Sequence, residues 1–359
     1  MPGFRNRNVV VTGASAGVGR AVALRFARAG ARVGLIARDA EALESVKQEI
    51  ERLGGSAVAV PADVADADAV FAAADEIRRA FGPIDVWIND AMVTVFALAW
   101  QISPEEFRRV TEVTYLGFVH GTLAALREMR PRDSGTVIQI GSALAYRGIP
   151  LQSAYCGAKH AIRGFTNSVR TELMHERSRI NIGIIELPAV NTPQFDWARA
   201  HTGRQPRPVP PVFQPEVIAD AAFRMAQRPR REIWVGLSTL QVILGNFLFP
   251  SLLDRYLARN MVAAQERAEA TQPGRRDNLF EPVHDLHRTH GSFGREARHT
   301  AVAMAGPAAR LVPVAAGVLA LAGTALLAYG LRGARASASH RRAPRQASRV
   351  SGPDHSDRL

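Results

Sequence analysis

The stretch NVVVTGASAGVG, residues 8–19, decides the fold. Its first five residues are mostly β-branched and predict a short, buried strand, and a helix-forming segment follows at 17–29. Glycines at this spacing between a strand and a helix permit a tight turn, close approach of the backbone to a pyrophosphate, and close packing of the helix on the strand. The N–H groups and dipole of the helix N-terminus then favour phosphate.

This loop therefore predicts a dinucleotide site formed by Gly13, Ser15, Gly17, Val18 and Gly19. A glycine-rich turn can also be purely structural. The strand before it and the helix after it favour the nucleotide.

Strand and helix patterns alternate along the next 220 residues or so. Further strands are predicted at 31–37, 56–64, 84–90, 135–142, 180–188 and 231–236, and helices at 39–54, 67–81, 104–129 and 151–177. This alternation requires crossover connections, and hence a parallel sheet covered on both faces. The sequence predicts a doubly wound α/β domain that binds ligands beyond the carboxyl ends of its strands.

The chain has 359 residues, which is enough for one large domain of roughly 250 residues and additional material. Its formal net charge of +12 raises the question of nucleic-acid binding. Residues 1–260 and the much shorter segment 261–359 each carry a net charge of +6, so the excess concentrates at the C-terminus. We expect no nucleic-acid partner and explain the basic tail by a membrane surface.

A single cysteine, Cys156, excludes an internal disulfide framework.

The residues after the second strand bear on the choice of cofactor. An acidic residue at its end would bind the ribose hydroxyls of NAD, whereas this chain has Arg38 followed by Asp39. A guanidinium can donate two hydrogen bonds to a 2′-phosphate, which favours NADP over NAD. The alternative is that Asp39 caps the next helix and Arg38 is solvated.

Only two of the 45 basic residues are lysine, Lys47 and Lys159. Lys159 follows Tyr155 by four residues in the helix-forming stretch SAYCGAKHAIRGF (153–165), so both side chains share one helix face. A nearby ammonium favours the phenolate and makes the tyrosine a better proton donor, and it can also reach the ribose hydroxyls of a nicotinamide nucleotide. Ser142, at the end of the fifth predicted strand, could hold a substrate oxygen opposite the tyrosine.

Taken together, these motifs resemble the short-chain dehydrogenase/reductase family, over about residues 5–200. The resemblance rests on the loop from Thr12 to Gly19, Asn89-Asp90-Ala91-Met92, Ser142, the Tyr155–Lys159 pair, and Pro188 to Thr192. It implies a Rossmann fold, and hydride transfer between a nicotinamide and a carbon of an alcohol or carbonyl substrate while Tyr155 exchanges the proton. It also implies that Asp63, Asn89, Lys159 and Thr192 contact the cofactor.

The chain departs from the family pattern at three positions. Met92 and Ala189 replace glycines, and Thr114 stands where the family usually has an asparagine. That asparagine bends its helix and holds a water in a proton relay to the lysine. Thr114 is therefore a fourth catalytic candidate, since a hydroxyl can also hold a water.

The C-terminal third suggests membrane attachment. Residues 237–257 are strongly apolar and predict a lid or a membrane-facing patch, and 261–306 predict a flexible linker. The spacing of His284, His287 and His290 suggests a metal site or, as we prefer, only part of that linker. Residues 311–331 carry no charge, so we expect a transmembrane or interfacial helix at 307–332, followed by a basic disordered tail at 333–359. The arginines beyond this span conflict with a cytoplasmic catalytic domain in a single crossing.

These observations predict a membrane-associated, NADP-dependent oxidoreductase with a cytoplasmic catalytic domain at 1–260. We expect it to interconvert a small lipophilic alcohol and its ketone or aldehyde, and to form a homodimer or homotetramer as the family often does. A non-catalytic dinucleotide-binding scaffold or sensor is the alternative. An epimerase or dehydratase acting on a nucleotide sugar is a third reading, which the apolar 237–257 stretch disfavours.

Overall fold

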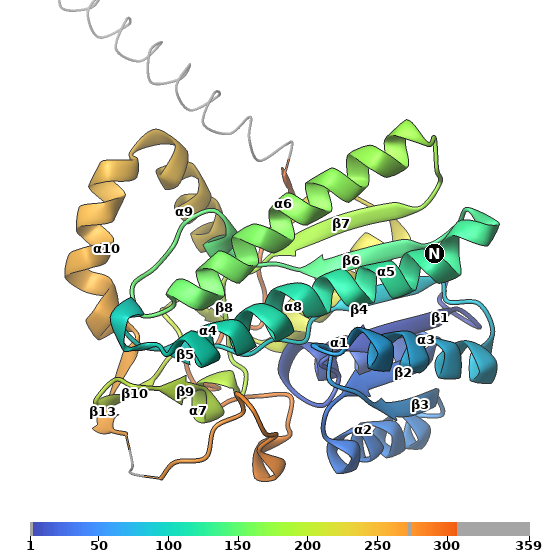
Figure 1. Cartoon of the computed structure of the whole chain (residues 1–359), viewed down its shortest axis with the longest axis horizontal. Helices are drawn as coiled ribbons and strands as arrows, with labels where there is room; N and C mark the ends of the chain where they lie inside the picture. The colour runs from blue at the N-terminus through green and yellow to red at the C-terminus, as the bar shows by residue number, and fades with distance from the viewer. Residues whose placement is uncertain (1–2, 272–273, 307–359) are drawn as a thin grey trace, which may run out of the picture. The chain divides into compact units, whose positions relative to one another are not determined.

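A parallel sheet forms the centre of the protein (Figure 1). The structure, a computed structural model, describes residues 3–271 and 274–306. The strands of the main sheet lie in the order β14-β12-β7-β6-β4-β1-β2-β3, and all neighbours pair in parallel except β14 with β12. Their bounds are β1 Asn8–Thr12, β2 Arg32–Ala37, β3 Ser56–Pro61, β4 Val86–Asn89, β6 Thr136–Ile140, β7 Asn181–Glu186, β12 Glu232–Val235 and β14 Ala303–Ala305.

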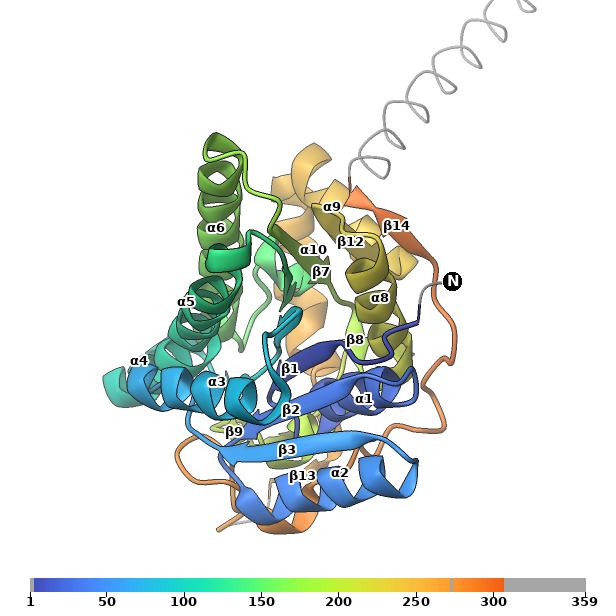
Figure 2. The same ribbon diagram turned by 90° about the vertical axis from the view of Figure 1, so that its right-hand side faces the viewer.

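Helices cover both faces of this sheet, as Figure 2 shows. One face carries α1 Gly17–Ala27, α2 Ala40–Arg52 and α8 Pro215–Gln227, and the other carries α3 Ala67–Phe81, α5 Gly117–Met129 and α6 Ser153–His175. Side chains of β1 alternate between the two cores: Val9 and Val11 pack towards α1, and Val10 packs on the opposite side with Trp87. The predicted doubly wound Rossmann-like architecture is confirmed.

The order of the strands determines where a ligand can bind. From β1 the chain proceeds through β2 and β3 in one direction, and then returns to β4 and continues in the other. The crevice at this reversal, between the carboxyl ends of β1 and β4, is the usual ligand site of open α/β sheets.

The predicted helix at 104–129 is not continuous. It comprises α4 Pro104–Thr111, a π-helical turn at Glu112–Leu116, and α5. The wide turn contains Thr114, whose buried hydroxyl donates to the carbonyl of Val93 at 2.8 Å. The backbone is thus irregular at the position where the family resemblance predicts a bend.

The C-terminal third differs from its prediction. The apolar stretch forms α9 Leu237–Leu248 and the start of α10 Pro250–Ala264. A flexible linker at 261–306 is wrong for the residues described there. They include the end of α10, β13 Glu266–Ala270, which pairs with β10 Arg204–Pro206, and β14, which extends the main sheet.

A few apolar anchors in this polar stretch explain the error. Leu279 is completely buried, and Val283, Phe293 and Ala297 are buried as well. The predicted segments 307–332 and 333–359 lie outside the described residues. Among the helices within 3–271 and 274–306, none combines the length and apolar character that a bilayer crossing requires.

Candidate active site

The glycine loop between β1 and α1 has the geometry that its spacing predicts. Gly13 and Gly17 adopt positive φ angles of 71° and 56°, which favour glycine. A Cβ on Gly19 would lie 2.2 Å from the carbonyl oxygen of Gly13, so only glycine lets α1 pack so close to the strand. The turn leaves the N-terminus of α1 at the carboxyl end of the sheet, where the helix dipole favours an anion.

A single cavity of about 390 Å³ joins this loop to the predicted catalytic residues. Its lining includes Gly13, Ser15, Gly17 and Val18 of the loop after β1. Arg38 and Asp63 line it on the side of β2 and β3, and Ser142, Tyr155, Lys159 and Thr192 line it on the side of β6 and β7. Glycine-rich backbone at a helix N-terminus suits a pyrophosphate, and the elongated lining suits a dinucleotide. The residues present therefore fit a nicotinamide dinucleotide.

Ser142, Tyr155 and Lys159 meet at the substrate end of the cavity. Ser142 follows β6, and its hydroxyl accepts the N–H of Leu144 at 3.1 Å. Tyr155 and Lys159 lie one turn apart on α6, and the Lys159 Nζ is 5.6 Å from the centre of the Tyr155 ring. The Lys159 ammonium is buried and donates to the carbonyl of Ile140 at 2.7 Å, which ties α6 to β6.

The pKa of Tyr155 differs from the sequence-based expectation. Burial raises it above its ordinary value, while a hydrogen bond with Ser142 opposes the rise. The nearby acidic groups of Cys156, Asp90 and Glu186 raise it further. Desolvation and the neighbouring acids therefore set the direction of the shift, which is opposite to the lowering expected from the lysine.

Two carboxyl groups beside this site were absent from the predicted set, those of the half-buried Asp90 and the fully buried Glu186. Asp90 lines the cavity, and burial raises its pKa while the charge of Lys159 and the N–H of Gly19 oppose the rise. Burial in turn lowers the pKa of Lys159, against the charges of Asp90 and Glu186. Asp90 lies within the motif Asn89-Asp90-Ala91-Met92, and its carboxylate beside Asn89 could have indicated it as a site residue.

Glu186, at the end of β7, is the second of these carboxyl groups. It is completely buried, and its Oε2 accepts the backbone N–H of Ser142 at 2.7 Å, whereas its Oε1 has no hydrogen-bond partner among the described residues. Burial, followed by the charge of Glu232, raises its pKa to about 8. The sequence indicated this residue only weakly, by the presence of a glutamate at the end of the apolar strand INIGIIE (180–186).

Arg38, Asp63 and Asp39 lie at the adenosine end of the cavity, and the first two make contacts that the sequence did not predict. The guanidinium of Arg38 donates to the carbonyls of Asn278 and Phe280, both at 2.6 Å. Asp63 pairs with Arg109 at 2.5 Å. Asp39 caps α2 by accepting the N–H of Ala42 at 2.9 Å, as the alternative interpretation expected.

His284 and His287 also converge on this end. Both approach the carboxylate of Asp39, with the His287 Nε2 at 3.0 Å. Burial raises the pKa of Asp39, but the N–H of Ala42 and the two histidines outweigh it, so the net shift is downward. His290 instead pairs with Glu216 at 2.8 Å, so the three histidines do not converge on one point.

Two further predicted residues serve the protein interior. Asn89 is fully buried, and its amide donates to Gln139 at 2.8 Å and to Thr122 at 3.2 Å. These bonds direct the amide towards α5 and β6, and the contact of Asn89 with the cofactor stays a prediction. The Thr114 hydroxyl donates to Val93 and also accepts the Val93 N–H at 3.0 Å, and its role in a proton relay stays a prediction.

Comparison with known proteins agrees with this geometry. The family model for short chain dehydrogenases matches residues 7–202. The uncharacterised oxidoreductase YxnA of Bacillus subtilis is 31% identical over 286 residues, which cover 79% of this chain and 80% of that protein. A fatty acyl-CoA reductase of Acinetobacter baylyi is 30% identical over 230 residues, 63% of this chain and 75% of that protein.

A solved structure is similar as well. An alcohol dehydrogenase from the archaeon Thermococcus sibiricus, complexed with 5-hydroxy-NADP, matches with a TM-score of 0.56 and 25% identity, over 64% of this chain and 95% of that one. The family match spans more than half of the chain and includes the loop, Ser142, Tyr155 and Lys159. The protein belongs to the short-chain dehydrogenase/reductase family of oxidoreductases, which act on alcohol and carbonyl groups.

Proposed function

We propose that the protein is an NADP-dependent oxidoreductase that interconverts a hydrophobic alcohol and its ketone or aldehyde. One observation carries the proposal: the phosphate loop and the residues Ser142, Tyr155 and Lys159 line the same cavity. Bound NADP would exchange a hydride with the substrate carbon beside these three residues. The side chains must then orient the substrate oxygen and exchange one proton with it.

Each of the three side chains has a distinct role in this proposal. The Ser142 hydroxyl holds the substrate oxygen, and Tyr155 donates a proton to that oxygen in reduction and removes it in oxidation. Lys159 places a buried positive charge below the tyrosine and orients the nicotinamide ribose. The raised pKa of Tyr155 keeps the phenol protonated at neutral pH, which suits proton donation during carbonyl reduction.

Apolar residues near the substrate end support a lipophilic substrate. Val242 on α9 and Leu257 and Met261 on α10 line the cavity. The same two helices expose large apolar side chains to solvent, including Phe247 at 59% and Leu252 at 64% of their surface. A continuous apolar route from surface to cavity would admit a long alkyl chain, and the reductase relative from Acinetobacter is named for fatty acyl-CoA.

NADP is preferred over NAD in this proposal because Arg38 lines the adenosine end. A guanidinium has five N–H donors, and its contacts with three backbone carbonyls leave others for a 2′-phosphate. The archaeal structural relative is a complex with an NADP derivative.

Membrane association on the cytoplasmic side remains part of the proposal. It rests on the apolar sequence at 311–331 and on the exposed apolar side chains of α9 and α10. Fractionation of the full chain and of a chain ending at residue 306 tests it: pelleting of both with membranes would assign attachment to α9 and α10, and pelleting of the full chain alone would assign it to the C-terminal segment. Recovery of both in the soluble fraction would refute attachment.

Assembly into dimers or tetramers through α5 and α6 is likewise proposed, by analogy with the family.

The substitution Tyr155→Phe tests the catalytic assignment. It removes the exchangeable proton and leaves the ring, so turnover in a panel of long-chain alcohols and ketones should fall by about 10² to 10⁴. The control is Tyr256→Phe, at a residue on α10 that is 54% exposed, and it should leave turnover unchanged. Activity retained in Tyr155→Phe would show that another group is the acid. Nucleotide binding without turnover of any substrate by the unmodified protein would favour the scaffold alternative.

A further inference from the structure

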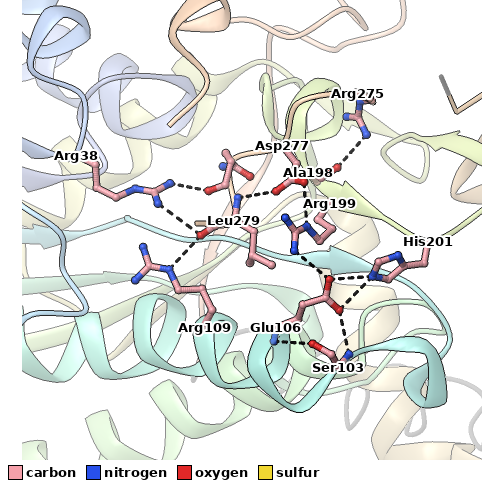
Figure 3. Close-up of polar contacts among 11 residues, drawn as sticks. Arg38, Ser103, Glu106, Arg109, Ala198, Arg199, His201, Arg275, Asp277 and Leu279 are labelled. Atoms are coloured by element: carbon pink, nitrogen blue, oxygen red, sulfur yellow. Dashed lines mark hydrogen bonds and ion pairs between the residues drawn. The ribbon is translucent and has the colours of Figure 1, made fainter. Parts of the chain in front are cut away.

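A segment near the C-terminus crosses the nucleotide end of the cavity. We call residues 274–293 the strap; in Figure 1 it is the orange segment below β10 and β9 (Arg199–Ala200). Arg38 donates to the strap carbonyls of Asn278 and Phe280, both at 2.6 Å. Arg109 donates through Nε to the carbonyl of Leu279 at 3.0 Å, as Figure 3 shows. Two arginines thus hold three consecutive carbonyl groups over the end of β2.

The strap continues from there to the phosphate loop. The N–H of Gly17 donates to the carbonyl of Arg288 at 3.0 Å, and Arg20 donates to the carbonyl of His287 at 3.0 Å. The Gly291 N–H then donates to the carbonyl of Asn191 at 3.2 Å, beside Thr192. The strap therefore runs from the adenosine end to the loop after β7, across the mouth of the crevice.

Its anchors lie on both sides of the crevice. Arg275 donates to the carbonyls of Phe195, Asp196 and Ala198, at 2.9 to 3.2 Å. Arg199 pairs with Asp277 at 2.9 Å, as Figure 3 also shows. Leu279 is completely buried in the core beneath. These contacts hold the strap at its two ends and at its centre.

The cavity persists beneath the strap, which forms a wall of it. Asn278, Pro282, Val283 and His287 are among the lining residues. Asn278 is only 7% exposed, and its amide oxygen has no hydrogen-bond partner among the described residues. A buried, unpaired acceptor in a cavity wall suits a donor on a ligand, such as an adenine amino group or a ribose hydroxyl.

The contacts at the phosphate loop also leave room for a ligand. Of the first N–H groups of α1, that of Gly17 is used by the strap and that of Gly19 by Asp90. Val18, between them, lines the cavity. The strap therefore leaves part of the helix N-terminus open to the cavity.

From these contacts we propose that the strap is a clamp that completes the adenosine half of the dinucleotide site and retains the bound nucleotide. Asn278 acts as a binding residue for the adenosine, and Arg38 connects the strap to the domain. This inference rests on the proposed function, since the ligand is its dinucleotide. The nucleotide must then enter and leave by displacement of the strap.

Hydrogen exchange of the unmodified full-length protein gives the first test. Saturating NADPH should slow amide exchange in peptides from 277–293 by about tenfold or more, because the nucleotide would hold the clamp closed. Peptides from β14, outside the crevice, serve as the internal reference. Faster exchange in the strap on binding would show that the nucleotide displaces it, and would overturn the clamp.

The second test compares two arginines of the same C-terminal segment. Arg275→Ala removes three anchoring hydrogen bonds, whereas Arg295→Ala changes an exposed side chain. NADPH dissociation, followed by stopped-flow fluorescence, should accelerate about tenfold in Arg275→Ala and stay unchanged in Arg295→Ala. A parallel comparison of Asn278→Ala should show weaker NADPH binding.

The outcomes separate the clamp from the proposed function. Tighter NADPH binding by Arg275→Ala would identify the strap as a competitor of the nucleotide. Binding with equal rates in all variants and no protection of 277–293 would refute the clamp and leave the oxidoreductase proposal intact. Failure of the unmodified protein to bind NADPH or NADH would overturn both.

Discussion

The backbone N–H of Ser142 donates to the buried carboxyl group of Glu186 across 2.7 Å. This bond links the end of β6 to the end of β7, directly behind the serine that we assign to the substrate oxygen. Because Glu186 lies in the sheet core, burial raises its pKa from 4.5 to about 8. The group is therefore mostly protonated in the folded protein at neutral pH, and ionised in the unfolded chain.

This difference predicts a pH dependence of stability. A carboxyl group whose folded pKa is raised binds a proton in the folded state that the unfolded state has lost. As the pH rises from about 4.5 to 8, this group should therefore lower the free energy of unfolding, by on the order of 1 kcal/mol per pH unit. Glu186→Gln keeps an acceptor for Ser142 and removes the titration, so its denaturant unfolding curves should vary less with pH than those of the unmodified protein.

The matched control for this prediction is Glu269→Gln, at an exposed position on β13. It should leave the pH dependence of unfolding unchanged. If Glu186→Gln and the unmodified protein lost stability in parallel from pH 5 to 8, Glu186 would be ionised throughout this range and its assignment as a buried neutral acid would be wrong.

Arg38 and Arg109 provide a test of cofactor selection. Both hold the strap, but we assign the 2′-phosphate only to Arg38. Arg38→Ala should weaken NADPH binding by about 10- to 100-fold relative to its effect on NADH, since it removes charge-assisted hydrogen bonds to the additional phosphate. Dissociation constants for both nucleotides, from fluorescence titration, measure the ratio.

Arg109→Ala controls for the loss of strap contacts. It removes the bond to Leu279 and the ion pair with Asp63, so it should weaken both nucleotides by similar factors. The loss of NADPH affinity relative to the loss of NADH affinity should thus be larger in Arg38→Ala than in Arg109→Ala. An equal ratio in the two variants would contradict the assignment of the 2′-phosphate to Arg38.

Most of the sheet could be predicted because its strands are local patterns. Runs such as NVVVT are short, β-branched and followed by glycine, and each precedes an amphipathic helix. The strap could not be predicted in this way, since its bonds with Arg38 and Arg109 use backbone carbonyls, which every residue has. Its apolar anchors, such as Leu279, are too widely spaced to form a periodic pattern.

The active site likewise combines residues that local sequence patterns predict with features that depend on contacts between distant parts of the chain. Residue types and spacing predicted Ser142, Tyr155 and Lys159 together, and the structure brings them into one cavity. Asn89 lies in the expected motif, but neighbouring polar residues on α5 and β6 draw its amide into the core. The pKa of the tyrosine depends on burial and on Asp90 and Glu186, which are distant in sequence, so the local Tyr-x-x-x-Lys spacing could not establish its direction.

The last prediction concerns the apolar end of the cavity. Val242→Trp adds a large ring where α9 meets the substrate end, and should shorten the space available to an alkyl chain. We expect kcat/KM for substrates of about twelve carbons to fall roughly tenfold, while that for four-carbon substrates changes less than about twofold. Leu53→Trp, at a position 48% exposed directly after α2, is the control and should affect neither class. Equal losses for long and short substrates in Val242→Trp would mean that the chain does not pass α9, because a blocked route discriminates by length and a general disturbance of the fold does not.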